Sequence, residues 1–253
     1  MNPIKKIIFE YAVPILGRIY QSKNKYCNVI YYHDIVNGQG HSYMRTNIAV
    51  FKHQMRYLVE NGYETMRFDD LDHHENFQYK QKRVLITFDD GWKSNYTNIF
   101  EFMQSLGLKY NVFLATGLID CDPNYLTWEQ VKEMHKSGLC GFGMHTHSHV
   151  DISDISRTDF ELEIVHANKL FEQFLGFQPL DFCYPFGKYS SESNIKLIRE
   201  TPYKRLYTSD MVYSYEYLTK FIMGRNAISN NEAMRVFRHK LEGLYNIFSL
   251  LKK

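Results

Sequence analysis

Six short, continuously apolar segments alternate with longer segments of helical periodicity along this 253-residue chain. Such runs, rich in Val, Ile, Phe and Tyr, are typical of β-strands that are buried on both faces. The predicted strands cover residues 27–33, 83–88, 110–115, 139–145, 180–185 and 204–209. Because strands of this kind need helices on both sides, the alternation predicts an α/β fold with a parallel sheet.

The intervening segments place apolar residues three and four positions apart, which is the spacing of an amphipathic helix. The predicted helices cover residues 49–61, 94–106, 127–137, 157–175, 190–200 and 231–251. Thr127 is a suitable N-cap, and Gly138 and Gly176 follow two of the helices as C-terminal glycines do. The strand–helix units are fewer than the eight of a complete barrel. We therefore predict a distorted, incomplete (β/α) barrel of about seven strands, forming a single domain over residues 26–253.

Charge and cysteine content narrow the classes of partner. Lys and Arg total 30 against 28 Asp and Glu, a net charge of +2, which is too balanced for a nucleic-acid binder. None of the four cysteines has CxxC spacing, so we predict neither a zinc knuckle nor a disulfide framework. Aromatic residues make up 16% of the chain. They suit a carbohydrate partner, but a well-packed core explains them better.

Residues 1–25 form an N-terminal extension that mixes basic and apolar residues. Glu10 and Arg18 interrupt its apolar stretch, which is too short and too polar for a transmembrane helix or a secretory signal. We expect an amphipathic helix docked on the domain's own core, and peripheral contact with a membrane surface is the alternative. No other segment approaches transmembrane length, so the sequence predicts a cytoplasmic protein.

Polar motifs follow the predicted strands, where a (β/α) barrel carries its functional residues. TFDDG (87–91) ends in the adjacent carboxylates Asp89 and Asp90. Such a pair suits a bound cation or a catalytic base, although a simple Asp-Gly turn would look the same. HTHSH (145–149) places His145 and His149 four positions apart, within reach of one metal ion. Together the two motifs favour a metal site over a solvated histidine-rich loop.

Two further motifs are weaker on their own. FCYPFG (182–187) is a stiffened turn that could present an aromatic wall and a backbone N–H to an oxyanion. An ordinary strand–helix turn would have the same composition. YYHDI (31–35) places His33 and Asp34 where the first strand opens into the barrel. A structural histidine is the alternative interpretation there.

Taken together, these motifs resemble those of the polysaccharide deacetylases of carbohydrate esterase family 4, the chitooligosaccharide deacetylase homology group. TFDDG, then LTWEQVKEMHKSGL (126–139) leading into GFGMHTHSH (141–149), then FCYPFG follow one another in the family's order. The resemblance covers roughly residues 28–228. It implies a distorted (β/α) barrel and hydrolysis of an N-acetyl group on an amino sugar, with release of acetate.

Residue by residue, the resemblance implies that Asp90, His145 and His149 bind a divalent metal, usually zinc. It implies Asp89 as the general base and the backbone N–H of Phe186 as an oxyanion donor. These roles are chemically coherent, because a metal polarises the amide carbonyl and acidifies water while a neighbouring carboxylate accepts the proton.

The chain departs from the family pattern at two places. Cys183 stands where many members have an arginine that orients the base, and the late Leu-x-His motif, whose histidine is the general acid in many members, is not recognisable. Members similar to the biofilm-polysaccharide deacetylases instead carry a Tyr-His-Asp segment, which YYHDI matches, so we assign the general acid to His33. We predict that Tyr184 and Arg225 contact substrate and that His147 supports its loop.

The predicted partner is a carbohydrate with an N-acetylated amino sugar, in a polysaccharide or a glycan precursor. Two alternatives remain. The lack of a recognisable secretion signal favours a deformylase or another C–N hydrolase acting on a nucleotide- or lipid-linked sugar. The departure at Cys183 and the missing late histidine favour a sugar-binding relative without catalysis. Retention of both aspartates and both motif histidines weighs against the latter.

Overall fold

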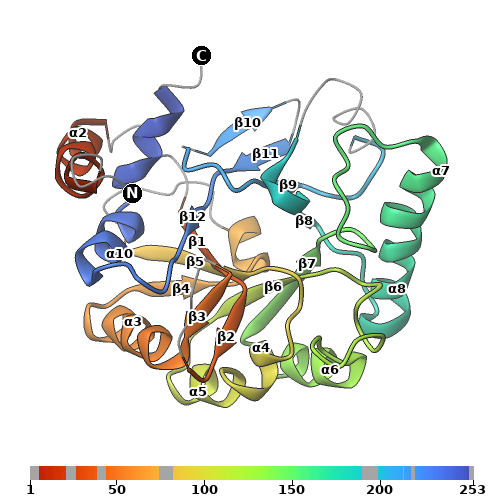
Figure 1. The fold of residues 1–253 in the computed structure, drawn as a ribbon. Helices are drawn as coiled ribbons and strands as arrows, with labels where there is room; N and C mark the ends of the chain where they lie inside the picture. Colours follow the sequence, from red (N-terminus) through yellow and green to blue (C-terminus); the bar gives the residue numbers. More distant parts are fainter. Residues whose placement is uncertain are drawn as a thin grey trace.

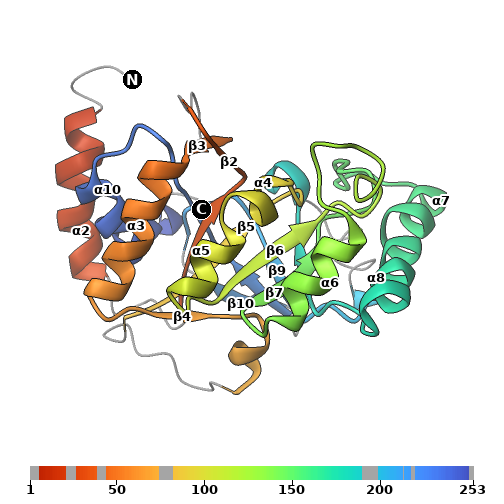
Figure 2. The same ribbon diagram turned by 90° about the horizontal axis from the view of Figure 1, so that it is seen from below.

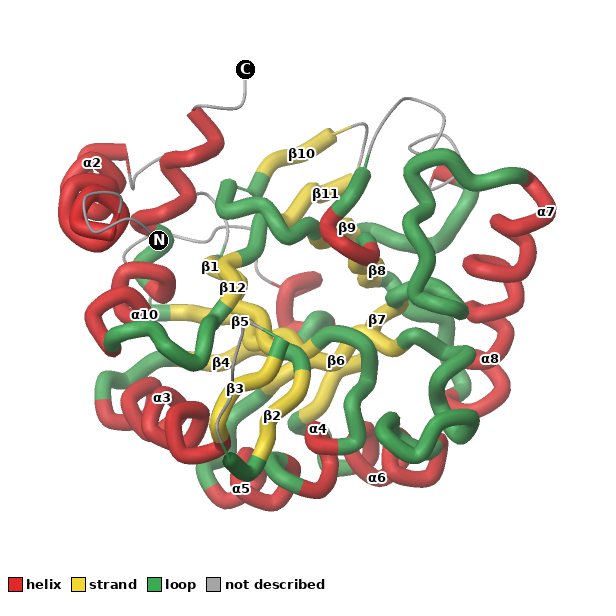
Figure 3. The backbone as a smooth tube through the Cα atoms, viewed as in Figure 1, coloured by secondary structure: helices red, strands yellow, loops and turns green. Residues whose placement is uncertain are grey.

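The computed structural model describes residues 6–20, 27–38, 44–73, 82–189, 199–212, 214–217 and 220–250. A curled sheet forms its centre, and helices surround the sheet (Figures 1 and 3). The strand order is β10-β11-β9-β8-β7-β6-β5-β1-β12, with β4 also paired to β5. From β11 to β12 this path holds eight parallel strands, and β10 is antiparallel at its end. The predicted distorted, incomplete (β/α) barrel is confirmed, with one more parallel strand than the seven expected.

Six of the strands are those that the sequence predicts. They are β1 (Asn28–Tyr32), β5 (Arg83–Phe88), β6 (Tyr110–Leu114), β7 (Cys140–Met144), β8 (Asp181–Cys183) and β9 (Arg205–Tyr207). Their residues are almost all buried, which accounts for the continuous apolar runs. The strands missed by the sequence analysis are β2 (Asp34–Val36), β3 (Arg45–Asn47), β4 (Glu64–Met66), β10 (Tyr215–Tyr217), β11 (Lys220–Met223) and β12 (Asn226–Ala227). Segments of two to four residues are too short to show a period.

A single chain segment joins the two ends of the sheet. β11 pairs with β9, and after only two intervening residues β12 pairs with β1. Those two residues are Gly224 and Arg225. The backbone passes so close to its neighbour here that a Cβ on Gly224 would lie 2.2 Å from the Val212 carbonyl oxygen. We call residues 220–227 the seam, and it brings Arg225 to the ends of β1 and β5.

The helices lie outside the sheet. They are α3 (Ile48–Glu60), α4 (Ser94–Thr97), α5 (Phe100–Ser105), α6 (Trp128–Lys136), α7 (Arg157–Phe160), α8 (Ala167–Leu175) and α10 (Met234–Leu241). Thr127 and Gln130 form a capping box at the start of α6, and Gly176 ends α8 with a φ of 78°. These ends agree with the sequence analysis.

Three predicted helices differ in detail. The helix predicted over 94–106 is interrupted at Asn98, whose side-chain amide donates a hydrogen bond to the Ile35 carbonyl of β2. The helix predicted over 157–175 contains a π-helical stretch, η4 (Glu161–His166), between α7 and α8. The helix predicted over 231–251 starts only at Met234 and is divided at Gly243 into α10 and a 3₁₀ turn, η6 (Leu244–Leu250). The helix predicted over 190–200 lies, apart from its last two residues, outside the described residues.

The N-terminal helix is docked on the domain through one of its faces. It consists of a π-helical stretch, η1 (Ile8–Ala12), and α2 (Val13–Tyr20), and it lies against η6. The contact is close because Gly17 has no side chain: a Cβ there would lie 2.1 Å from the Leu244 carbonyl oxygen. Phe9 stacks on Tyr245 with ring centroids 4.4 Å apart, and Glu10 pairs with Arg235 at 2.6 Å. Among the described residues, no helix is long and apolar enough to cross a bilayer.

Aromatic side chains dominate the interior. Eleven of the twelve largest fully buried side chains are Phe or Tyr, which supports the core interpretation of the aromatic excess. The twelfth is Arg225. A fully buried guanidinium is costly unless it is paired and hydrogen-bonded, so its surroundings are of particular interest.

Candidate active site

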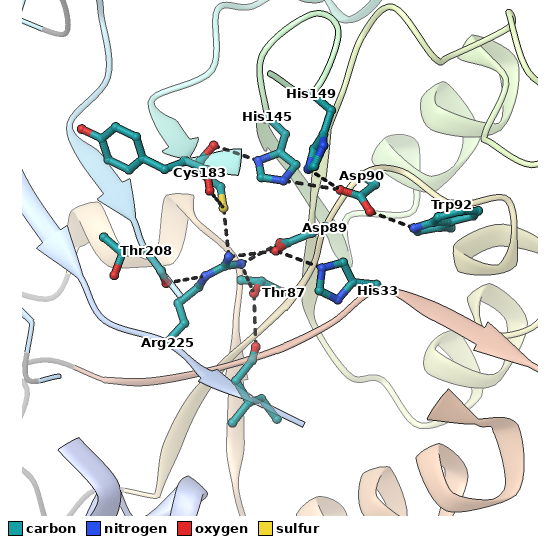
Figure 4. A network of polar contacts seen from close by, with 12 residues as sticks. His33, Thr87, Asp89, Asp90, Trp92, His145, His149, Cys183, Thr208 and Arg225 are labelled. Atoms are coloured by element: carbon teal, nitrogen blue, oxygen red, sulfur yellow. Dashed lines mark hydrogen bonds and ion pairs between the residues drawn. The ribbon is translucent and has the colours of Figure 1, made fainter. Parts of the chain in front are cut away.

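A cleft of about 470 Å³ opens at the carboxyl ends of the central strands. Its lining consists of Tyr31, His33, Met44, Asp89, His145, His149, Tyr184, Phe186, Gly187, Ser209 and Arg225. Seven of the eight predicted site residues are in this group, and the eighth, Asp90, contacts two of them. Figure 4 shows how side chains from β1, β5, β7, β8 and the seam converge here. The structure therefore brings together all the predicted residues.

Asp90, His145 and His149 form a candidate metal site. Their ligand atoms all lie within 4.8 Å of one another. The Nε2 atoms of His145 and His149 are 3.4 and 3.2 Å from the same oxygen, Oδ1 of Asp90. This oxygen is buried and accepts no hydrogen bond. A buried carboxylate oxygen without a donor, facing two imidazole nitrogens, fits a divalent metal ion.

Neighbouring groups orient two of these ligands. His145 Nδ1 lies 2.8 Å from the Cys183 carbonyl oxygen, to which it donates, so that Nε2 presents its lone pair to Asp90. Trp92 donates from Nε1 to the second oxygen of Asp90, Oδ2, at 2.9 Å, and this fixes the direction of Oδ1. The Trp92 ring is itself held by stacking on Tyr125, with centroids 4.6 Å apart.

Backbone strain is concentrated in the site. Asp90, Thr146, His149 and Phe186 have φ angles of 73°, 64°, 57° and 60°. Among the described non-glycine residues, only Asp120 shares this left-handed conformation. Each such residue costs about 1–3 kcal/mol and persists only where the surrounding structure enforces it. Local strain is thus accepted where it aims the candidate ligands.

Glu163 holds the histidine loop in this shape. The residue is 4% exposed and belongs to the π-helical stretch η4. Its Oε2 accepts hydrogen bonds from the backbone amides of His147 and Ser148 at 3.0 and 2.8 Å. His147 itself points away from the metal ligands, and its Nδ1 lies 3.0 Å from the Thr116 hydroxyl. Its geometry is that of a loop support.

Asp89 is bound by Arg225 in a buried, bidentate ion pair. Nη1 and Nη2 of Arg225 lie 2.6 and 2.8 Å from the two carboxylate oxygens. The side chains of Arg225 and Asp89 are only 1% and 4% exposed. Burial raises the pKa of Asp89, but the Arg225 guanidinium outweighs it and holds the pKa below its ordinary value. Asp89 is therefore an ionised carboxylate next to the candidate metal site.

The remaining donors of Arg225 are directed at the chain itself. Nε donates to the Thr208 carbonyl oxygen at 3.0 Å, Nη1 to the Thr87 hydroxyl at 3.3 Å, and Nη2 to the Cys183 sulfur at 3.0 Å. The short side chain of Cys183 thus leaves the space that the guanidinium enters from the seam. Asp89, His145 and Cys183 also lie close enough to share a metal. The Arg225 cation contacts two of these three, which disfavours a second cation there.

His33 lies on the other side of Asp89. Its Nε2 is 3.8 Å from Asp89 Oδ2, and the residue is 8% exposed. Burial lowers the pKa of His33, and the opposing fields of Asp89 and Asp90 do not restore it. The imidazole is therefore neutral at neutral pH.

The two aromatic residues of the YPFG turn differ in exposure. Phe186 is 62% exposed, and its ring packs edge-on against His149 at 4.8 Å. Tyr184 is 1% exposed and packs against Phe182 and Tyr189. The Phe186 ring is thus the more accessible of the two to a ligand, and a substrate contact by Tyr184 stays a prediction.

A second cavity, of about 280 Å³, lies away from these residues and is lined in part by Arg67, Asp181 and Arg205. Its charged groups are paired with one another: Arg205 bonds Asp181 at 2.6 Å and Asp72 at 2.6 Å, and Arg67 bonds Asp69 at 2.8 Å. We therefore place the functional site in the cleft, where charged groups converge on an oxygen without a donor.

Sequence analysis missed Trp92 and Glu163, and it interpreted Arg225 as a substrate contact. Trp92 directly follows TFDDG and is one of only two tryptophans, a signal that was available. Glu163 carries no comparable signal, because a glutamate within a helical segment usually faces solvent. The partner of Arg225 is 136 positions away in the sequence, so only the fold reveals the pair.

The fold and the site define a class of protein: an α/β barrel with a candidate Asp–His–His metal site at the carboxyl ends of its strands. The family model for polysaccharide deacetylases matches residues 77–206. The chain therefore belongs to the polysaccharide deacetylase family.

Relatives and solved structures agree with this assignment. YxkH of Bacillus subtilis, named for the same family, is 29% identical over 184 residues, covering 72% of this chain and 64% of the relative. Poly-beta-1,6-N-acetyl-D-glucosamine N-deacetylase of Escherichia coli is 27% identical over 128 residues, covering 44% of this chain and 19% of the relative. The chain thus spans less than two thirds of the length of these curated relatives.

Two solved structures have a similar fold. A polysaccharide deacetylase structure from Bacillus anthracis has a TM-score of 0.73 at 24% identity, covering 86% of this chain and 69% of that one. A Streptococcus pyogenes deacetylase in complex with acetate has a TM-score of 0.75 at 20% identity, covering 85% and 97%. At these identities the similarity concerns the fold.

Proposed function

We propose that this protein is a metal-dependent hydrolase that removes the N-acetyl group from an amino sugar. The observation that carries the proposal is the buried Asp90 Oδ1, which accepts no hydrogen bond and faces Nε2 of both His145 and His149. An ionised carboxylate, Asp89, lies beside this cluster in the same cleft. Metal ligands and a base at one point are the requirements for hydrolysing an unactivated amide.

Asp90, His145 and His149 would hold the metal, for which we propose zinc. Two imidazoles and one carboxylate are the ligand set of many catalytic zinc sites, which leave a further position for water or substrate. When bound, the metal supplies Lewis-acid chemistry: it polarises the amide carbonyl and acidifies water.

Asp89 is the proposed general base, and it accepts the proton of the water that attacks the carbonyl carbon. Arg225 is a positioning residue for this base, because its five N–H donors are committed to Asp89, Thr87, Thr208 and Cys183. We therefore assign Arg225 this role instead of the substrate contact predicted from the sequence. Its guanidinium keeps Asp89 ionised and fixes the plane of the carboxylate.

His33 is the proposed general acid. Its lowered pKa makes a protonated ring give up its proton readily, which suits transfer to the nitrogen of the breaking C–N bond. The backbone N–H of Phe186 is the proposed donor to the developing oxyanion. In the complete reaction one water is consumed, and acetate and a free amine leave.

An N-acetylated amino sugar is the proposed substrate. Among the relatives, one is named for poly-beta-1,6-N-acetyl-D-glucosamine and another, from Bacillus cereus, for peptidoglycan N-acetylglucosamine. The exposed ring of Phe186 beside His149 offers a face on which a sugar can pack next to the metal ligands.

The test combines elemental analysis with an acetate-release assay on N-acetylglucosamine oligomers of both types. We expect about one zinc per chain and acetate release that a chelator abolishes and zinc restores. His145→Ala/His149→Ala should lose both metal and activity, whereas Asp89→Asn should keep the metal and lose turnover. His147→Ala is the matched control from the same loop and should keep its metal. A purified protein that binds no zinc, even when zinc is added, would overturn the proposal.

A further inference from the structure

The N-terminal helix presents an apolar face to solvent. Six large apolar residues within residues 6–20 are 50–68% exposed: Ile7, Ile8, Tyr11, Ile15, Leu16 and Ile19. We call these six residues the isoleucine face. In the rest of the described chain, only Val59, Leu162 and Phe186 are large, apolar and exposed, and they lie on three different elements. Apolar exposure is therefore concentrated on one helix, which is typical of an interaction surface.

This exposure is not the result of a loosely attached helix. The opposite face of the helix is closely packed, with Gly17 against the Leu244 backbone and Phe9 stacked on Tyr245. Both Figure 1 and Figure 2 show α2 at the outer edge of the molecule. A single helix at an edge is convex and offers no groove for a partner's side chains. It is shaped to lie on a surface or to insert one face into it.

Positive charge surrounds the isoleucine face. Lys6 and Arg18 are exposed on the helix itself, and on α10 Arg235 lies over the Tyr11 ring at 4.1 Å. Besides partial burial, the positive fields of Arg18, Arg235 and Arg238 lower the pKa of His239, so these three guanidinium groups surround one point.

Acidic groups are nearly absent from this region. The first 25 residues contain five basic side chains and one acidic side chain, Glu10. Glu10 is 16% exposed and is turned inward to Arg235. The remaining 228 residues hold 25 basic and 27 acidic side chains. The positive charge of the chain is thus gathered at the helix that carries the apolar face.

We propose that the isoleucine face binds the surface of an anionic lipid bilayer, with the helix lying in the plane of the interface. Aliphatic side chains on one face with cations beside them match the two layers of such a surface: apolar chains below and phosphate groups at headgroup level. The convex shape and the surplus of positive charge favour lipid over a second copy of this chain, whose cations would repel these. The inference is independent of the proposed deacetylase activity.

Co-sedimentation of the full chain with vesicles tests the inference. We expect binding to phosphatidylcholine vesicles that contain phosphatidylglycerol, weaker binding to pure phosphatidylcholine, and a decrease as salt is raised. Ile15→Ser/Ile19→Ser should reduce the partition coefficient by about tenfold or more, because two aliphatic side chains no longer enter the interface. Both residues are over 60% exposed, so the variant should fold normally. Val59→Ser/Leu162→Ser is the matched control and should bind as the parent does.

Two results would overturn the inference. One is a parent protein that stays in the supernatant with both kinds of vesicle. The other is light scattering that shows a dimer for the parent and a monomer for Ile15→Ser/Ile19→Ser, since a second copy would then cover the face. Equal binding by both double variants would also exclude this face as the lipid contact. Each measurement is made without substrate, so failure of the deacetylase proposal would not affect it.

Discussion

Removal of the buried Arg225 charge should destabilise the protein far more than an ordinary surface substitution. The informative change is Arg225→Met, which retains an apolar stem against Tyr31 and Phe113, whose rings lie 4.3 and 5.6 Å from the guanidinium. It removes both bonds to Asp89 and leaves that carboxylate 4% exposed without its cation. Breaking a buried ion pair in this way typically costs about 3–5 kcal/mol. For a chain of this size, that corresponds to a fall in Tm of roughly 6–20 °C.

A double-mutant cycle separates the ion pair from the packing. Asp89→Asn in the Arg225→Met background removes the unpaired charge, so the double variant should regain about 2 kcal/mol or more relative to Arg225→Met. Arg225→Lys provides a control that keeps the charge but loses the fork geometry, and it should fall between the parent and Arg225→Met. Urea unfolding followed by circular dichroism, with chelator present throughout, gives the four corners of the cycle.

Additive single and double variants would refute this reasoning. An interaction energy below about 0.5 kcal/mol is the value found for independent sites. It would mean that the carboxylate of Asp89 does not depend on Arg225 for its charge. The assignment of Arg225 as the positioning residue for the base would then be wrong.

Three further predictions concern other contacts. Glu163→Ala leaves the amides of His147 and Ser148 without their acceptor and should lower zinc affinity by about 10- to 100-fold, with partial recovery in Glu163→Gln, as measured by competition with a chromogenic chelator. Partial burial raises the pKa of Asp70, but the Arg67 amide and the Lys109 ammonium outweigh it and lower the pKa. The stability from this group is therefore present above the unfolded pKa of about 3.9 and lost as pH falls through the folded value, so Asp70→Asn should cost up to about 1 kcal/mol at pH 7 and nothing near pH 2 in urea titrations. Gly17→Leu places a side chain where a Cβ alone would lie 2.1 Å from the Leu244 carbonyl oxygen, and it should cost about 1–3 kcal/mol and make residues 6–20 sensitive to limited proteolysis; unchanged cleavage would show that the helix tolerates the larger side chain.

The sequence predicted the parts of the fold that have a physical period. β5 and β6 are buried over nearly their whole length, so each appears as an uninterrupted apolar run. The seam strands β11 and β12 have four and two residues and could not be recognised in the same way. Helix boundaries were predictable where a local signal exists, as at Thr127 and Gly176. The break at Asn98 depends on a hydrogen bond to β2, a contact between distant parts of the sequence.

The candidate site followed the same rule. Asp90, His145 and His149 lie in motifs at strand ends, and the barrel brings them together as the family resemblance implies. The hydrogen bond from His145 to the Cys183 carbonyl and the donation from Trp92 are set by backbone position and ring orientation, which no motif encodes. The role of Arg225 depends on the closure of the sheet. Local chemistry was therefore predictable, whereas the groups that orient it were not.

The seam has a consequence for the order in which the chain becomes competent. His33 follows the first strand of the sheet and Arg225 precedes the last, so the contacts around Asp89 close a loop of nearly 200 residues. Contacts of such long range form late, because the chain entropy lost in closing the loop is regained only when the intervening elements are packed. A chain still being synthesised, or one cleaved before the seam, would contain the whole Asp90–His145–His149 cluster and yet bury Asp89 without its cation. Completion of the base thus reports that the C-terminal part of the barrel is in place.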